Sequence, residues 1–199
     1  MKKGRFVLMN IFVIFILITL TIGCTESDNK QNEEEDDEEA IILTVIYGNH
    51  QANYTFENIE ATESFTGTGR YIKAKLLPDI VEIGDSHEYT GVRIKTLLEH
   101  VPNIPSNYNV SIISKDGWTV TYTIDEVYGD VDIYNEKGEI ISNGTANMIL
   151  AFKEDGKYYS EIESGDEIGP LRIAFVGEDV ITSSSLWSKM VVSIEIISI

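Results

Sequence analysis

The central part of this chain reads Glu88-Tyr89-Thr90-Gly91-Val92-Arg93-Ile94-Lys95-Thr96-Leu97-Leu98-Glu99. A glycine is followed here by apolar residues at helical spacing, so we expect Gly91 to let the chain turn before a helix over residues 92–101. The apolar face of this helix would consist of Val92, Leu97, Leu98 and Val101. The sequence therefore predicts a helix at this point, between segments that have the pattern of strands.

On both sides of this helix, apolar and polar residues alternate with the two-residue period of strands. Two hairpins are predicted, one around residues 48–50 and one around Asp116-Gly117, a pair that favours a tight turn. A second short helix is expected over residues 56–61, with Thr55 as its N-terminal cap. Because the elements follow no regular βαβ order, we expect a mixed, strand-rich α+β fold. The predicted strands cover residues 41–47, 51–56, 109–114, 119–123, 148–152, 171–176 and 191–197.

The N-terminus has the parts of an export signal. A basic start precedes an apolar run over residues 11–18, which leads into Leu20-Thr21-Ile22-Gly23-Cys24. This ending resembles the cleavage site of a lipoprotein, in which a cysteine follows the cut. We therefore expect a signal over residues 1–24, cleavage after Gly23 and a lipid on Cys24.

Two other arrangements of the N-terminus remain open: an uncleaved membrane helix over residues 6–23, or a secreted protein without an anchor. In each case the rest of the chain lies outside the cytoplasm, and a lipid on Cys24 would hold it at the outer face of the cytoplasmic membrane. Cys24 is the only cysteine in the sequence. Once lipidated, it leaves the exported part without a disulfide, a thiolate nucleophile or a cysteine-bound metal.

Charge divides the remainder of the chain into a tether and a folded domain. Residues 25–39 hold nine acidic residues and one lysine, a composition that predicts a disordered tether. Residues 40–199 are long enough for one domain with its own core. This domain has 24 acidic and 11 basic residues, a net charge of −13, which argues against nucleic acid as a partner. On an exported protein, N-glycosylation could occur at three sequons, those of Asn53, Asn109 and Asn143.

Five segments together resemble a known family. The central segment 88–99 is followed by Ser114-Lys115-Asp116-Gly117-Trp118, by residues 149–157, by Gly169-Pro170-Leu171-Arg172-Ile173-Ala174-Phe175 and by residues 187–196. In this order they resemble the oxidoreductase molybdopterin-binding domain, the fold of the sulfite oxidase family. The likeness covers residues 54–196.

The resemblance implies a cofactor site that this sequence lacks in part. Redox enzymes of the family bind molybdenum through a cysteine thiolate and through the dithiolene of a pterin. The cysteine would fall within residues 67–75, where there is none. Residues 176–185, where these enzymes tend to carry a basic pterin loop, are acidic and then rich in serine, and acidic residues repel an anionic cofactor. We therefore expect a noncatalytic relative without a cofactor.

Such a relative would bind a small ligand or a partner protein. If the cleft of the family is retained, its lining would suit a small anionic or aromatic ligand. A membrane or redox partner protein is the second hypothesis, and an exposed aromatic patch at Tyr158, Tyr159 and Trp187 would favour it. The candidate ligand-binding residues are Arg70, Trp118, Arg172 and Lys189.

The alternative to a noncatalytic domain is a molybdopterin-dependent oxidoreductase, with molybdenum or tungsten, in which another group replaces the thiolate. Ser64, Thr68 or Tyr71 would stand near the place of the missing cysteine. A hydroxyl group, however, is much harder to deprotonate at neutral pH than a thiol.

Hydrolase chemistry and a metal-only site find less support in the sequence. The three histidines are isolated from one another, and no Gly-X-Ser-X-Gly or His-Glu-X-X-His motif occurs. One acidic cluster is a candidate for Ca²⁺, but it lacks the ligand spacing and the central glycine of an EF-hand loop. We therefore favour a solvated acidic loop for this cluster, which consists of Asp125, Glu126, Asp130 and Asp132.

Overall fold

Strands make up most of the regular structure in the computed structural model, which describes residues 39–73 and 81–199. The predicted signal over residues 1–24, and the predicted tether up to residue 38, lie outside the described residues. Within the described ranges no helix is both long and apolar enough to cross a membrane. The described residues belong to a single compact unit with a core of its own.

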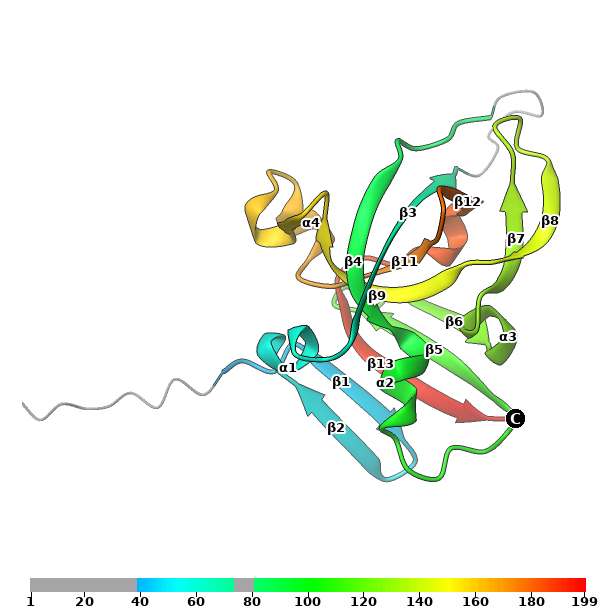
Figure 1. Cartoon of the computed structure of the whole chain (residues 1–199). Coiled ribbons are helices and arrows are strands. Elements are labelled where there is room, and N and C mark those ends of the chain that lie inside the picture. Colours follow the sequence, from blue (N-terminus) through cyan, green and yellow to red (C-terminus); the bar gives the residue numbers. More distant parts are fainter. Residues whose placement is uncertain (1–38, 74–80) are drawn as a thin grey trace, which may run out of the picture. The chain divides into compact units, whose positions relative to one another are not determined.

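The first sheet places the beginning and the end of the domain side by side. Its strand order is β2-β1-β13-β5-β6 (Figure 1). β1 pairs in parallel with β13, and all other neighbours in this sheet are antiparallel. Both predicted hairpins are present, and Gly48 and Gly117 in their turns have φ values of 57° and 86°, which glycine adopts without strain. The strands are β1 (Leu43–Tyr47), β2 (His50–Tyr54), β5 (Tyr108–Ser114), β6 (Thr119–Thr123) and β13 (Val191–Ser198).

The second sheet has the strand order β10-β9-β4-β3-β12, and β11 pairs with β9 outside this path (Figure 1). β12 runs parallel to β3, whereas the other pairs are antiparallel. A two-stranded ribbon of β7 (Asp130–Tyr134) and β8 (Ile140–Thr145) packs against β12. The strands of the second sheet are β3 (Ser64–Ile72), β4 (His87–Arg93), β9 (Asn147–Glu154), β10 (Lys157–Tyr158), β11 (Arg172–Val176) and β12 (Val180–Ser183).

The helices are short and connect the strands. Thr55 caps the first of them, as predicted: its side chain accepts a hydrogen bond from the backbone N–H of Asn58. Thr123 caps a later helix in the same way, through the backbone N–H of Glu126. The helices are α1 (Phe56–Glu60), α2 (Ile94–Glu99), α3 (Ile124–Val127) and α4 (Gly165–Ile168), together with the 3₁₀ turns η1 (Tyr159–Glu161) and η2 (Ser184–Leu186).

The strand-rich α+β class is confirmed, and each of the seven predicted strands is present with its ends displaced by at most two residues. Among the described residues, six strands were not predicted from the alternation of apolar and polar residues: β3, β4, β7, β8, β10 and β12. β3 is the most instructive, since its glycines and threonines break the apolar alternation on which the prediction relies. A Cβ atom at Gly69 would lie 2.4 Å from the carbonyl oxygen of Phe175, so this glycine lets β3 pass close to β11.

The predicted helix over residues 92–101 is wrong in its bounds. α2 begins only at Ile94, because Val92 and Arg93 still belong to β4 and pair with Leu150 and Ile149 of β9. The expected role of Gly91 changes as well. Gly91 lies inside β4 beside a register shift, and a Cβ atom there would lie 2.2 Å from the carbonyl oxygen of Leu150. A glycine is needed at this position because β4 and β9 approach closely, and not because the chain turns there.

One continuous apolar core joins the two sheets. Val45, Ile112 and Ile194 of the first sheet belong to the same buried cluster as Leu150 and Phe175 of the second. All five residues of β11 are buried, including the first, Arg172. Burial of apolar surface in this core is the main stabilising contribution.

The close approach at Gly91 predicts a large loss of stability on adding one methyl group. We expect Gly91→Ala to lower the free energy of unfolding by about 2–3 kcal/mol, because β4 and β9 would have to separate. Gly84→Ala is the control, since its Cβ atom would meet its nearest neighbour in Tyr71 at an ordinary 3.6 Å. Urea unfolding of both variants measures the difference, and equal losses would contradict the packing argument.

Candidate functional site

Arg172 is buried in the second sheet and is neutralised there. Only 6% of its side chain is exposed, and its Nη1 atom lies 3.2 Å from Oε2 of Glu154. The guanidinium carbon lies 5.4 Å from the ring centroid of Tyr89 and 5.1 Å from that of Trp187, within the range of cation–π contacts. Within the described residues, Nε of Arg172 and the hydroxyl group of Tyr159 have no hydrogen-bond partner. Burial raises the pKa of the Tyr89 and Tyr159 phenols well above the ordinary value, and the adjacent Arg172 opposes this rise.

A histidine extends this charged group toward the surface. Nδ1 of His87 lies 2.7 Å from Oδ2 of Asp155 and 3.7 Å from Oε1 of Glu154. The hydrogen bond with His87 lowers the pKa of the Asp155 carboxyl, and a second hydrogen bond, from the backbone N–H of Glu88, adds to this effect. The His87 ring thus lies between the Asp155 and Glu154 carboxylates, and Glu154 in turn pairs with Arg172, so this group joins the turn after β9 to the start of β4.

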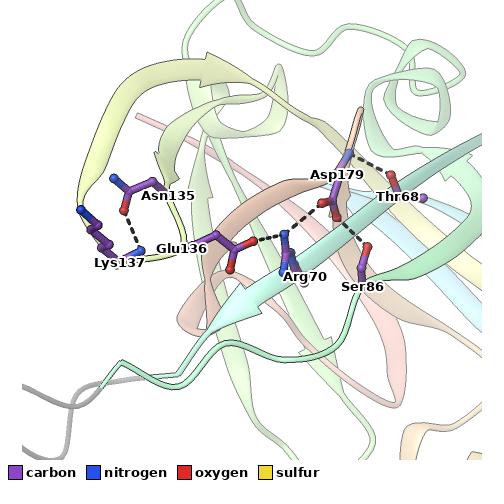
Figure 2. A network of polar contacts seen from close by, with 7 residues as sticks. All are labelled: Thr68, Arg70, Ser86, Asn135, Glu136, Lys137 and Asp179. Carbon is purple, nitrogen blue, oxygen red and sulfur yellow. Dashed lines mark hydrogen bonds and ion pairs between the residues drawn. The ribbon is translucent and has the colours of Figure 1, made fainter.

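Arg70 forms a second network, drawn in Figure 2. Its Nη2 atom lies 2.5 Å from Oε1 of Glu136 and 3.0 Å from Oδ2 of Asp179. Ser86 donates to Oδ1 of Asp179 at 2.5 Å, and the backbone N–H of Asp179 donates to Oγ1 of Thr68 at 2.8 Å. Two carboxylates thus face a single guanidinium group, and the side chain of Arg70 is only 19% exposed.

The local backbone positions both carboxylates. Glu136 stands in the turn between β7 and β8, where Oδ1 of Asn135 accepts a hydrogen bond from the backbone N–H of Lys137 (Figure 2). The same oxygen also accepts from the backbone N–H of Glu139. Asp179 stands before β12 with a φ of 57°, a conformation that aspartate tolerates better than most residues. The sequence pattern did not predict this network, because its members come from β3, the β7–β8 turn and the approach to β12.

The other two candidate ligand residues have different surroundings. Trp118 follows the turn of the β5–β6 hairpin and is 64% exposed. Lys189 is also exposed, next to Met190, whose carbonyl oxygen accepts a hydrogen bond from the backbone N–H of Lys115 in the same hairpin. Arg70 and Arg172, in contrast, belong to strands of the second sheet, and each of them is paired with carboxylates.

Near that hairpin lies a cavity of about 800 Å³. Its walls come from α1, β10, η1, α4 and β13, together with the turn of the β5–β6 hairpin, and none of the four candidate residues belongs to them. Met190 in this wall has a φ of 51°, and its backbone is held by a hydrogen bond to the carbonyl oxygen of Ile168. The apolar part of the lining consists of Phe56, Tyr158, Tyr159, Pro170, Met190 and Val192.

The remaining predicted features are distributed as follows. Tyr159 and Trp187 are buried and Tyr158 is half-buried, so these three residues form no exposed aromatic patch. The four residues of the acidic cluster line a hollow of about 480 Å³, but the Glu126 carboxylate accepts hydrogen bonds from Thr123. In the described part of the chain, no three His, Cys, Asp or Glu side chains are grouped as a metal ion would require.

The residues present do not fit the molybdopterin group that the resemblance implies. The described part of the segment 67–75 holds hydroxyl groups but no thiol, and the Thr68 hydroxyl already accepts from Asp179 and donates to the carbonyl of Gly177. The nearby cation, Arg70, faces two carboxylates rather than a free pocket. An anionic phosphate at this place would meet the negative charge of Glu136 and Asp179.

Ten chains of solved structures match this chain, and one of them belongs to the crystal structure of the sulfane dehydrogenase SoxCD from Paracoccus pantotrophus, with a TM-score of 0.53 and 16% sequence identity. The match covers 78% of this chain and 37% of that chain, so the chain spans little more than a third of its neighbour's length. No family model matches the sequence, and no curated protein matches it. At this identity the likeness concerns the fold alone, and it supports a distant molybdopterin-binding-like fold.

The burial of Arg172 predicts a strong effect of removing its charge. We expect Arg172→Met to lower the free energy of unfolding by about 3 kcal/mol, because the Glu154 carboxylate would remain with its main partner gone. Adding Glu154→Leu to this variant should restore a large part of the loss. Urea unfolding of the single and double variants checks this, and a double variant as unstable as the sum of both single ones would contradict it.

The lowered pKa of Asp155 predicts a specific dependence of stability on pH. A carboxylate with a lowered pKa in the folded state stabilises the fold above its unfolded pKa, and this contribution is lost as the pH falls through the folded pKa. The stability difference between the natural protein and Asp155→Asn should therefore shrink as the pH is lowered from about 5 to about 2. Thermal unfolding over this range measures it, with Asp132→Asn, at an exposed position in β7, as the matched control.

Proposed function

We propose that this chain is a noncatalytic, exported binding domain, built on a molybdopterin-binding-like fold and carrying neither molybdenum nor tungsten. The ion pairs of Arg70 with Glu136 and Asp179 carry this proposal. They neutralise a cation in the segment where the family resemblance would place the metal-binding cysteine. A domain that keeps the scaffold and neutralises this position is suited to binding rather than to redox chemistry.

The alternative, an oxidoreductase with a hydroxyl ligand to the metal, has weaker support. Thr68 uses its hydroxyl group in hydrogen bonds to the segment before β12. The ring of Tyr71 packs against Trp187 at a centroid distance of 5.4 Å, and Ser64 lies at the exposed start of β3, where it pairs with Val92. Each of these hydroxyl groups would also have to be deprotonated at neutral pH, which is far harder than for a thiol.

The location in the cell is part of the same proposal. A lipid on Cys24 would tether the domain to the outer face of the cytoplasmic membrane, with residues 25–39 as the spacer. The net charge of −13 over residues 40–199 would keep such a domain soluble and would favour cationic ligands and partners over anionic ones.

The proposal is tested by the cofactor content of the purified protein. We expect the full chain, produced in a host supplied with both molybdate and tungstate, to contain far less than one metal ion and one pterin per chain. Elemental analysis measures the metal, and fluorescence after oxidation measures the pterin. An established molybdopterin enzyme from the same host is the positive control, and metal and pterin near one per chain would overturn the proposal.

A further inference from the structure

We propose that the cavity beside the β5–β6 hairpin is a binding site for a small organic cation with an aromatic or bulky apolar body. This inference deepens the proposed function, because it names the site and the class of ligand. Neither Arg70 nor Arg172 lines this cavity, although Tyr159 in its wall lies beside Arg172.

The shape and lining of the cavity suit a small ligand. Its volume of about 800 Å³ lies within the range of small-molecule sites, and apolar side chains make up most of its wall. The wall is assembled from four segments that are separate in the sequence, one of which contributes Phe56 of α1. On one side stand η1 and α4, and on the other stand β13 and the turn before β6.

Tight backbone contacts keep these walls in place. A Cβ atom at Gly165 would lie 1.5 Å from the carbonyl oxygen of Tyr159, so α4 packs directly on η1. A Cβ atom at Gly169 would lie 2.9 Å from the Cα atom of Met190, which brings the end of α4 against the start of β13. The cavity is therefore preformed, and a ligand would not have to order its walls on binding.

The charges around the cavity favour a cation. Asp116 and Asp166 both belong to the lining, against a single cation, Lys115. One oxygen of Asp116 accepts a hydrogen bond from the backbone N–H of Trp118, which holds the carboxylate at the turn of the hairpin. An anionic ligand would meet this negative local charge and the net charge of −13 of the whole domain.

The aromatic residues of the wall favour a cation for a second reason. The face of an aromatic ring attracts positive charge, and the half-buried side chains of Phe56 and Tyr158 line the cavity, whereas Tyr159 is buried. The Tyr158 ring already makes such a contact within the protein, with the ammonium nitrogen of Lys153 at 4.1 Å from its centroid. A cation with an apolar body matches both the rings and the carboxylates, whereas a neutral apolar molecule matches the rings alone.

The test uses two probes of the same shape and opposite charge: (1-naphthylmethyl)trimethylammonium and 1-naphthylmethanesulfonate. Equilibrium dialysis against the full chain in a nonionic detergent, with the detergent alone as blank, measures both by naphthyl fluorescence. At about 0.15 M salt, where exposed charges are largely screened, we expect the cation to bind at least about tenfold more tightly than the anion. Equal affinities would overturn the assignment of the ligand class.

Two substitutions on one strand identify the site. Val192 and Ile197 are both exposed side chains of β13, at 36% and 45%, but only Val192 lines the cavity. Val192→Trp should weaken binding of the cationic probe by about tenfold or more, while Ile197→Trp should leave it within about twofold. Because both positions are exposed, both variants should fold, and their circular dichroism spectra check this. Equal effects of the two substitutions would overturn the site.

A charge control separates the cavity from general attraction to an acidic protein. Asp116→Asn with Asp166→Asn should weaken the cationic probe by about fivefold, the order expected of two exposed ionic contacts. Asp125→Asn with Asp132→Asn removes the same charge from the acidic cluster and should have a smaller effect. An equal effect of the two pairs would overturn the proposal. A failure of this site is distinguishable from a failure of the proposed function, since none of these variants alters metal or pterin content.

Discussion

Burial of β11 is the constraint on which the rest of this structure depends. All of its residues are buried, it pairs with β9, and it packs against β3 at a point where only glycine leaves enough room. Its first residue is Arg172, so the fold has to place a charge inside the core. Glu154 on the paired strand supplies the opposite charge, and Tyr89 and Trp187 supply ring faces. The aromatic and charged residues in this part of the core are thus consequences of one buried strand.

The network of Arg70 shows how an acidic sequence affects the same scaffold at its surface. Glu136 and Asp179 arrive from two separate turns and meet the guanidinium group above β3. In a cofactor enzyme a cation at such a place would be available to an anionic group. Here the opposing charges lie within the protein itself, so the position contributes to holding three segments together rather than to recognising a phosphate.

The cavity near the β5–β6 hairpin is lined by neither Arg70 nor Arg172. It lies at the junction of the first sheet with η1 and α4, and its charged residues remain largely exposed. Internal ion pairs therefore account for Arg70 and Arg172 of the predicted ligand site, whereas the junction of the first sheet with η1 and α4 contains the cavity. The ion pairs of Arg70 and Arg172 would stabilise the fold, while other residues would bind the ligand. Residues of the binding site could then be substituted without loss of the fold.

The sequence by itself determined the strand-rich class, both hairpins, the Thr55 cap and all seven of the apolar strands, since these depend on local alternation and turn chemistry. It also determined the absence of a thiol after Cys24. Only the tertiary structure decided the role of Gly91, which depends on the approach of β9, and the pairing of Arg70 and Arg172 with carboxylates. The cavity, too, is visible only after folding, because its walls come from segments whose contact no local pattern encodes.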